Sequence, residues 1–115
     1  MARINFVELP AAGFVASRRF YTEAFGWEMT GFGPSYACTM TGDVDLGLQG
    51  DAVEATAAPL PVIEVGDLEA ALASVREAGG QISKPVFGFP GGRRFHFRDP
   101  SGCELAVMQA DATQG

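Results

Sequence analysis

The chain has 115 residues, 47% of them hydrophobic, which fits one domain with a single core. Its formal net charge of −6 and pI of about 4.6 disfavour nucleic acid and anionic membranes as partners. The two cysteines form no CxxC motif or disulfide-rich pattern, and no leader is visible. No apolar run approaches the ~20 residues of a spanning helix. We therefore expect a cytoplasmic protein with reduced thiols and no membrane partner.

The first half of the chain predicts a strand, a helix and three short strands. Their ranges are 4–9, 13–25, 27–31, 35–40 and 44–49. On the first strand, alternation places Phe6 and Glu8 on one face. Gly26 ends the helix. The predicted apolar stripe of this helix consists of Phe14, Val15, Phe20 and Ala24.

The second half repeats this order after a linker of small residues. A strand, a helix and three strands are predicted at residues 60–65, 68–78, 81–87, 93–98 and 103–109. Asp67 is a suitable N-cap for the helix. The glycine-rich segment 88–92 lacks the lysine and the following helix of a phosphate loop. It is either a mobile lid or a hairpin connection.

The matching order of elements indicates an internal duplication. Phe25-Gly26 matches Ala78-Gly79, Gly42 matches Gly102, and Gln49 matches Gln109. We predict a single α+β domain over residues 1–115. It consists of two βαβββ modules, at 1–50 and 60–110, joined by a linker at 51–59.

Three segments carry a family resemblance that covers nearly the whole chain. They are Phe20-Tyr21 with Ala24-Phe25-Gly26-Trp27, Glu64-Val65-Gly66-Asp67-Leu68-Glu69-Ala70-Ala71 with Ala78-Gly79-Gly80, and Arg94-Phe95-His96-Phe97-Arg98-Asp99-Pro100-Ser101-Gly102. In this order they resemble the vicinal oxygen chelate superfamily, which includes glyoxalases, bleomycin-resistance proteins and extradiol dioxygenases. The resemblance implies a cup-shaped, partly open β-barrel with the helices outside. It also implies a divalent metal, held by His or Gln on the first strand and Glu on the last strand of each module.

The positions that the resemblance assigns to the metal ligands are apolar in this chain. They fall at Phe6, at Leu46, at Val62 (or Leu60, depending on the alignment of the helices) and at Ala106. None of these side chains can donate a lone pair to a metal. His96 is the only histidine. We therefore predict no cofactor.

A shifted metal site stays open as an alternative. Glu8, Glu64 and Glu104 share strand parity with the expected ligand positions, and with His96 they could hold a divalent ion. The simpler interpretation is that these carboxylates pair with arginines or water. The three catalytic candidates are His96, Glu8 and Glu104.

A small-molecule pocket is the other expected feature. Tyr36 is placed at the position matching His96 and shares a face with Cys38. The predicted ligand-binding residues are Phe6, Glu8, Tyr36, Cys38, Glu64 and His96. Phe6 and Tyr36 could equally fill the cup as core.

Two function classes follow from this pattern. The preferred one is a metal-independent homodimer that binds a planar or cationic small molecule, as the resemblance to bleomycin-resistance proteins implies. The alternative is a metal-dependent lyase, isomerase or dioxygenase of the glyoxalase type with carboxylate ligands. The sequence leaves open whether the protein is an enzyme.

Overall fold

The protein is an α+β chain, and the computed structural model describes residues 2–112. Within these residues there are eight strands and two helices. In chain order they are β1 (Arg3–Pro10), α1 (Phe14–Phe25), β2 (Thr30–Gly31), β3 (Tyr36–Cys38), β4 (Asp45–Gln49), β5 (Leu60–Glu64), α2 (Leu68–Glu77), β6 (Gln81–Phe89), β7 (Gly92–Arg98) and β8 (Glu104–Ala110). Neither helix of this described part is long and apolar enough to cross a membrane. The chain divides into two compact units, Asn5–Leu60 and Pro61–Gly115 with Met1–Ile4.

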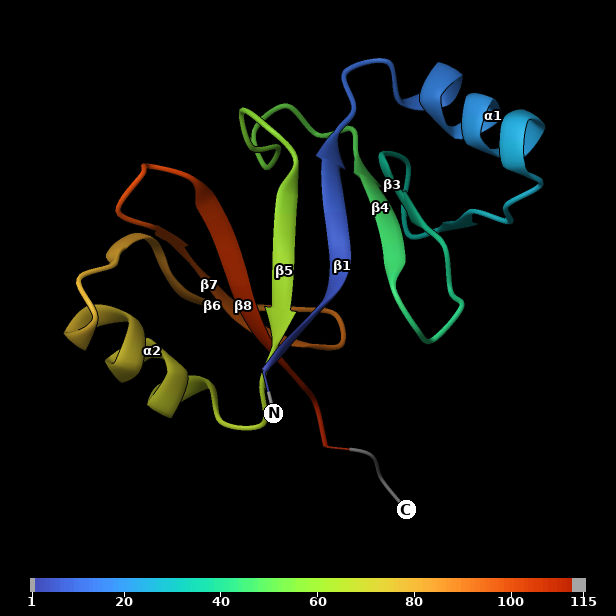
Figure 1. Cartoon of the computed structure of the whole chain (residues 1–115). Coiled ribbons are helices and arrows are strands. Elements are labelled where there is room, and N and C mark those ends of the chain that lie inside the picture. Colours follow the sequence, from blue (N-terminus) through green and yellow to red (C-terminus); the bar gives the residue numbers. More distant parts are fainter. Residues whose placement is uncertain (1, 113–115) are drawn as a thin grey trace. The chain divides into compact units, whose positions relative to one another are not determined.

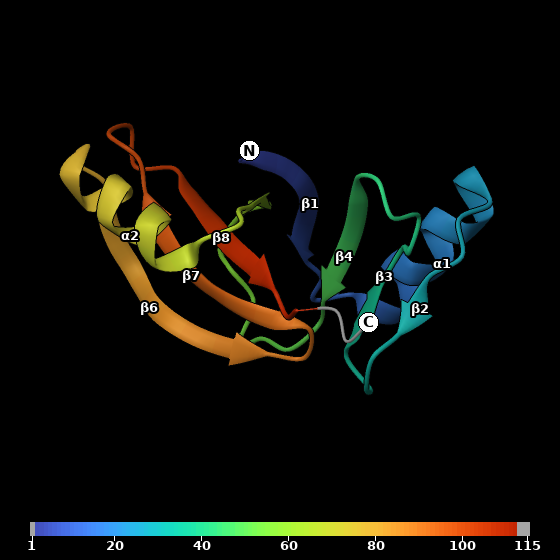
Figure 2. The same ribbon diagram turned by 90° about the horizontal axis from the view of Figure 1, so that it is seen from below.

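In the unit Asn5–Leu60 the strands lie in the order β2-β3-β4-β1 (Figure 1). β1 runs parallel to β4, while β3 is antiparallel to both β2 and β4. Helix α1 lies along one face of these strands (Figure 2). The core beneath it contains Ala11, Met29, Ala37 and Leu48.

The face of α1 that packs on this core differs from the prediction. Val15 and Phe20 are 70% and 57% exposed, and no residue of the helix is fully buried. Phe14 and Tyr21 are the residues that pack on the core. The predicted stripe of Phe14, Val15, Phe20 and Ala24 was therefore wrong except for Phe14. Half-buried Arg18 donates a hydrogen bond to the Met29 carbonyl at 2.7 Å, so the stripe is interrupted by a cation that binds backbone.

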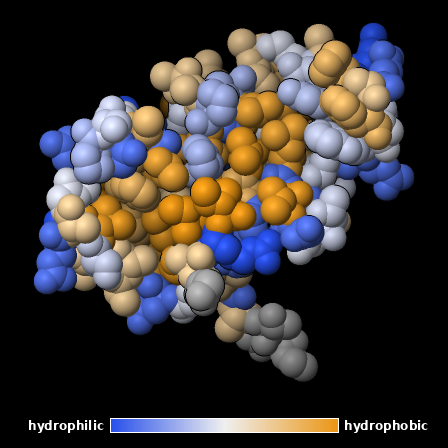
Figure 3. All heavy atoms as spheres, in the orientation of Figure 1, coloured by the Kyte–Doolittle hydropathy of each residue, from blue (hydrophilic) through white to orange (hydrophobic). Residues whose placement is uncertain are grey.

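In the other unit the strand order is β5-β8-β7-β6, with β5 parallel to β8 and the remaining pairs antiparallel. Helix α2 covers one face of this sheet, and Leu68, Phe95 and Val107 form the core between them (Figure 2). Hydrophilic residues mark the outer side of α2 (Figure 3). The predicted cap is confirmed, because the Asp67 side chain accepts a hydrogen bond from the Ala70 amide at 3.0 Å.

The segment 88–92 is a tight hairpin. β6 continues to Phe89 and β7 begins at Gly92, so only Pro90 and Gly91 lie between the strands. Gly91 has a φ of 106°, a conformation that glycine adopts without strain. Phe89 pairs with Gly92 in the ladder. The expectation of a mobile lid was therefore wrong, and the hairpin alternative is correct.

Candidate functional site

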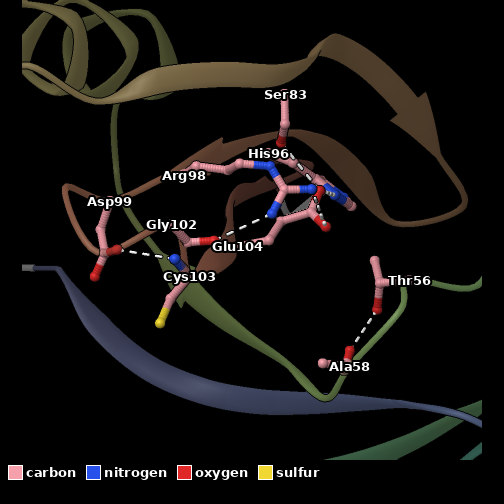
Figure 4. Close-up of polar contacts among 9 residues, drawn as sticks. All are labelled: Thr56, Ala58, Ser83, His96, Arg98, Asp99, Gly102, Cys103 and Glu104. Atoms are coloured by element: carbon pink, nitrogen blue, oxygen red, sulfur yellow. Dashed lines mark hydrogen bonds and ion pairs between the residues drawn. The ribbon is translucent and has the colours of Figure 1, made fainter.

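The most unusual polar group in the unit Pro61–Gly115 is His96. It lies on β7 between Ala106 of β8 and Lys84 of β6. Its imidazole is only 2% exposed. Nδ1 lies 3.1 Å from Oε2 of Glu104, and the two side chains point toward each other from neighbouring strands (Figure 4). The fold thus joins two of the three catalytic candidates.

Glu104 is held as a carboxylate by several donors. The Ser83 hydroxyl donates to Oε2 at 3.0 Å, and Arg98 Nη2 lies 3.9 Å from Oε1 (Figure 4). Burial alone would raise the pKa of Glu104, but the hydrogen bonds from His96 and Ser83 outweigh burial and the pKa is lowered. Because an ionised carboxylate can only accept, His96 must carry its hydrogen on Nδ1.

The other ring nitrogen of His96 has no partner. Burial lowers the pKa of His96 and outweighs the hydrogen bond with Glu104, which raises it, so the ring is neutral at pH 7. With the hydrogen on Nδ1, Nε2 presents a bare lone pair. Nε2 is buried, and no described residue donates a hydrogen bond to it. A buried acceptor without a donor is rare in proteins, which makes His96 Nε2 the candidate contact for a ligand.

An aromatic ring and two cations lie beside the imidazole. The centroid of Phe87 is 5.8 Å from that of His96. Lys84 Nζ lies 4.5 Å, and Arg94 Cζ 5.2 Å, from the Phe87 centroid. The β6–β7 register shifts on both sides of Lys84, and these bulges bring Ser83, Lys84 and Phe87 to the side of His96. The sequence pattern did not identify these three residues, because a β-bulge interrupts the alternation from which the face of each strand residue was predicted.

A second polar pair lies in the unit Asn5–Leu60. Glu8 is 2% exposed, and its Oε1 accepts a hydrogen bond from the Tyr36 hydroxyl at 3.0 Å. Across the sheet, Glu8 lies beside Gly47, and Gly47 beside Cys38. Burial raises the pKa of the Cys38 thiol, which argues against a reactive thiolate. Glu8, Tyr36 and Cys38 thus share one face, as expected.

The register shows that Tyr36 does not correspond to His96. Gly47 of β4 pairs with Cys38, as Ala106 of β8 pairs with His96. The neighbouring buried pairs, Ala37–Leu48 and Phe95–Val107, align in the same way. Cys38 is therefore the counterpart of His96. The glycine turns are not equivalent reference points, since Cys38 lies four residues before Gly42 whereas His96 lies six residues before Gly102.

Two predicted metal-ligand positions also change. Leu46 packs on the α1 side with Leu9, so it faces away from Phe6 and Glu8. The first-strand position moves from Phe6 to Glu8, because Glu8 pairs with Gly47 as Val62 pairs with Ala106. The position that matches Ala106 is Gly47. A Cβ atom there would lie 2.5 Å from Phe6 Cζ and 2.6 Å from the Tyr36 hydroxyl oxygen. The two rings fill the space that a ligand side chain from Gly47 would need.

Three of the four corrected positions, Gly47, Val62 and Ala106, offer no metal donor, whereas the fourth, Glu8, is a carboxylate. Val62 and Ala106 are neighbours in the other unit, and both are buried and apolar. The alternative ligands Glu64, Glu104 and His96 do not form a metal site either. Glu104 contacts His96, but within the described part of that unit no third His, Cys, Asp or Glu side chain completes a group that could hold a metal. Glu64 does not join the pair, which corrects the expected convergence of Glu64, Glu104 and His96.

Two surface hollows lie away from these polar pairs. One is on the outer surface of α1. The other, of about 360 Å³, is lined by Val7, Trp27, Thr39, Thr41, Val44, Asp45 and Leu46. The latter opens on the side of the sheet opposite Glu8. A pocket shared by Phe6, Tyr36 and His96 remains a prediction.

Comparison with known proteins identifies relatives of the chain. Residues 3–107 match the sequence model of the Glyoxalase/Bleomycin resistance protein/Dioxygenase superfamily. The protein named "Putative glyoxylase CFP32", from Mycobacterium tuberculosis and Mycobacterium bovis, is 30% identical over 126 residues. That alignment covers 93% of this chain and 45% of the relative, so the chain spans about half the relative's length.

Solved structures with low sequence identity share the fold. Hypothetical protein BH1468 from Bacillus halodurans has a TM-score of 0.81 at 14% identity, with 99% and 98% of the two chains covered. Methylmalonyl-CoA epimerase from Mycobacterium tuberculosis has a TM-score of 0.73 at 14% identity, covering 95% and 88%. The Mn(II)-bound glyoxalase from Novosphingobium aromaticivorans has a TM-score of 0.65 at 19% identity, covering all of this chain and 44% of that one.

Proposed function

This chain belongs to the Glyoxalase/Bleomycin resistance protein/Dioxygenase superfamily, and we propose that within it the chain binds a planar small molecule without a metal. The observation that carries the proposal is the buried His96, whose Nε2 has no hydrogen-bond donor while Nδ1 is fixed by Glu104. A ligand that donates to Nε2 would satisfy the buried acceptor. An aromatic wall with a few oriented polar groups is typical of small-molecule sites.

The donor set supports metal independence. Val62 and Ala106 cannot coordinate a metal, Phe6 and Tyr36 occupy the space beside Gly47, and Glu8 is the one carboxylate at the four positions. Restoring a ligand would therefore require moving two aromatic side chains, besides changing a residue. His96 offers one free nitrogen, whereas a stable site for a divalent transition ion needs several converging donors.

The character of the ligand follows from the surroundings of His96. Phe87 offers a ring for stacking, which supports the planar ligand expected from the sequence. The surroundings carry both signs of charge, since the Glu104 carboxylate raises the pKa of His96 whereas Arg94 and Lys84 lower it, so charge at this ring selects neither a cationic nor an anionic ligand. The protein is further proposed to be cytoplasmic and to form a homodimer. Dimerisation would bury exposed aromatic residues, which a domain of this size cannot cover by itself.

A thermal-shift screen of aromatic compounds and cationic glycopeptides tests the binding proposal. We expect at least one planar compound to raise the melting temperature of the wild type, and His96→Gln to abolish that rise. The matched control is Arg93→Gln, because Arg93 points to the other face and binds Glu69 at 2.6 Å. A well-folded wild type that responds to none of the compounds would contradict the proposal.

Metal analysis tests the alternative enzyme. Protein purified without chelators should contain far less than one equivalent of Ni, Zn, Mn or Fe, and EDTA should leave its melting temperature unchanged. A stoichiometric metal that is lost on substitution of Glu8, Glu64 or Glu104 would instead establish the metal-dependent lyase, isomerase or dioxygenase.

A further inference from the structure

We propose that the unit Asn5–Leu60 has a binding site of its own, in the hollow of about 360 Å³ beside Trp27, and that this site takes a small organic cation. The ligand class is a primary ammonium group carried on an apolar body. Every described residue that lines this Trp27 hollow belongs to the same unit, and none of them belongs to the site at His96. The inference is therefore independent of the proposed function.

The walls of the Trp27 hollow are mostly apolar. Val7, Val44 and Leu46 line it together with Trp27, and the side chains of Val44 and Trp27 are 54% and 39% exposed. Its volume is near the lower end of the range typical of small-molecule sites. A single ring or a short alkyl chain would cover these side chains and remove apolar surface from water.

Neighbouring side chains of α1 hold the Trp27 ring in place. The ring lies 5.8 Å from that of Tyr21 and nearly parallel to it, at 9°, and 5.1 Å from that of Phe25. The Trp27 carbonyl accepts a hydrogen bond from the Thr22 hydroxyl at 2.9 Å. Because the ring is already ordered and still partly exposed, contact with a ligand costs little entropy. Aromatic rings also attract cations, and tryptophan does so most strongly.

Asp45 supplies a negative charge to the hollow. Burial alone would raise the pKa of this carboxyl, but hydrogen bonds from Thr41, Thr39 and Gly42 outweigh burial and lower it, so the group is ionised at pH 7. Oδ1 accepts from the Thr39 hydroxyl at 2.7 Å and from the Thr41 amide at 2.8 Å. Oδ2 accepts from the Gly42 amide at 3.1 Å. Since a carboxylate has about four acceptor positions, Oδ2 keeps one for an N–H donor.

The charge of the lining sets the sign of the ligand. Among the described residues that line the hollow, Asp45 alone has a charged side chain. Hydrogen bonds, rather than a neighbouring Lys or Arg, lower the pKa of Asp45, so its charge is not neutralised by a cation of the described part. The net charge of −6 adds a general attraction for cations. An anion in the hollow would be repelled by the Asp45 carboxylate.

Trp27 is the only tryptophan, so its fluorescence and its indole N–H signal in ¹⁵N-labelled full-length protein report on the hollow. Four probes are titrated: 2-phenylethylamine, 2-phenylethanol, 3-phenylpropionate and methylamine. We expect 2-phenylethylamine to bind most tightly and to shift the Trp27 indole signal. The neutral alcohol should bind about tenfold more weakly, because it lacks the charge-assisted hydrogen bond to Asp45. The acid has the wrong charge and methylamine has no apolar body, so both should bind more weakly still.

Substitutions of exposed valines test the charge without changing the hydrogen bonds of Asp45. Val44→Lys places a cation at the rim of the hollow and should weaken 2-phenylethylamine binding several-fold, whereas Val44→Glu should strengthen it. The matched control is Val53→Lys, because Val53 is 89% exposed and does not line the hollow. Asp45→Asn should weaken binding about tenfold. Circular dichroism confirms that each variant is folded, and the Val44 variants carry the test if Asp45→Asn does not fold.

Four results would refute the cation site. In the first, the alcohol or the acid binds as tightly as the amine. In the second, Val44→Lys weakens binding no more than Val53→Lys does. In the third, no probe shifts the Trp27 signal, or the signal changes with protein concentration alone and the amine adds nothing, since a second copy of the chain then covers the hollow. In the fourth, His96→Gln abolishes amine binding, which would move the amine to the site at His96. We expect His96→Gln to leave amine binding unchanged.

Discussion

Replacing Gly47 by alanine tests the packing that excludes a ligand at this position. The added Cβ atom would lie 2.5 Å from Phe6 Cζ and 2.8 Å from Phe6 Cε2. It would also lie 2.6 Å from the Tyr36 hydroxyl oxygen. Favourable carbon contacts are about 3.5–4.0 Å. Both rings must therefore move by roughly 1 Å relative to the β4 backbone.

The cost of this movement has two parts. Forcing an extra methyl group into a packed site typically costs about 1–3 kcal/mol. Displacing the Tyr36 hydroxyl also weakens its 3.0 Å hydrogen bond to the buried Glu8, and an intramolecular hydrogen bond is typically worth about 0.5–1.5 kcal/mol. Because the rings can relax in part, we expect Gly47→Ala to lower the free energy of unfolding by about 2–4 kcal/mol.

Urea denaturation followed by circular dichroism measures this loss. The matched control is Gly88→Ala, another strand glycine, where an added Cβ atom meets nothing within 4 Å. That control should change the unfolding free energy by less than about 0.5 kcal/mol. In a Tyr36→Phe background, which removes the hydroxyl, Gly47→Ala should cost less, with a coupling of at least about 0.5 kcal/mol. If Gly47→Ala were no more destabilising than the Gly88 control, the filled-site argument would be refuted.

Three further predictions concern the polar groups. Because the pKa of His96 is lowered in the folded protein, the unfolded chain binds this proton more readily. The free energy of unfolding should therefore fall as the pH drops below about 6.5. In urea titrations between pH 7 and 5.5, the His96→Gln variant should lack this pH dependence. Glu104→Gln removes a group that raises the pKa of His96, so an NMR titration of the histidine should show a still lower pKa. A higher pKa would contradict the proposed interaction between His96 and Glu104. Asp67→Ala should lower the unfolding free energy by about 1 kcal/mol, whereas Asp67→Asn, which keeps the cap, should cost much less.

Much of the fold could be predicted from the sequence, because its signals are local. Gly26 and Gly79 both adopt positive φ, at 71° and 98°, where helices were expected to end. Alternation placed Phe6 and Glu8 on one face correctly. The helix stripe on α1 could not be predicted in this way, since Arg18 is turned inward by a backbone carbonyl that only the tertiary structure supplies.

The site was less predictable, because it depends on register. Counting from Gly42 and Gly102 assumed turns of equal length, and one extra residue moved the counterpart of Ala106 from Leu46 to Gly47. In a strand, a shift by one residue changes the face of every side chain. His96 and Glu104 were named correctly as candidates, yet their partner Ser83 reaches them only through a bulge.

The two units keep a common register but carry different chemistry at matching positions. Where Cys38 lies in one, His96 lies in the other, and where Gly47 leaves room for the Phe6 and Tyr36 rings, Ala106 adjoins the imidazole. The donors that remain are a buried carboxylate satisfied by a phenol and a buried imidazole with one nitrogen unsatisfied. The first is already paired and stabilises the fold. The second still lacks a donor, which is why the binding proposal is placed at His96.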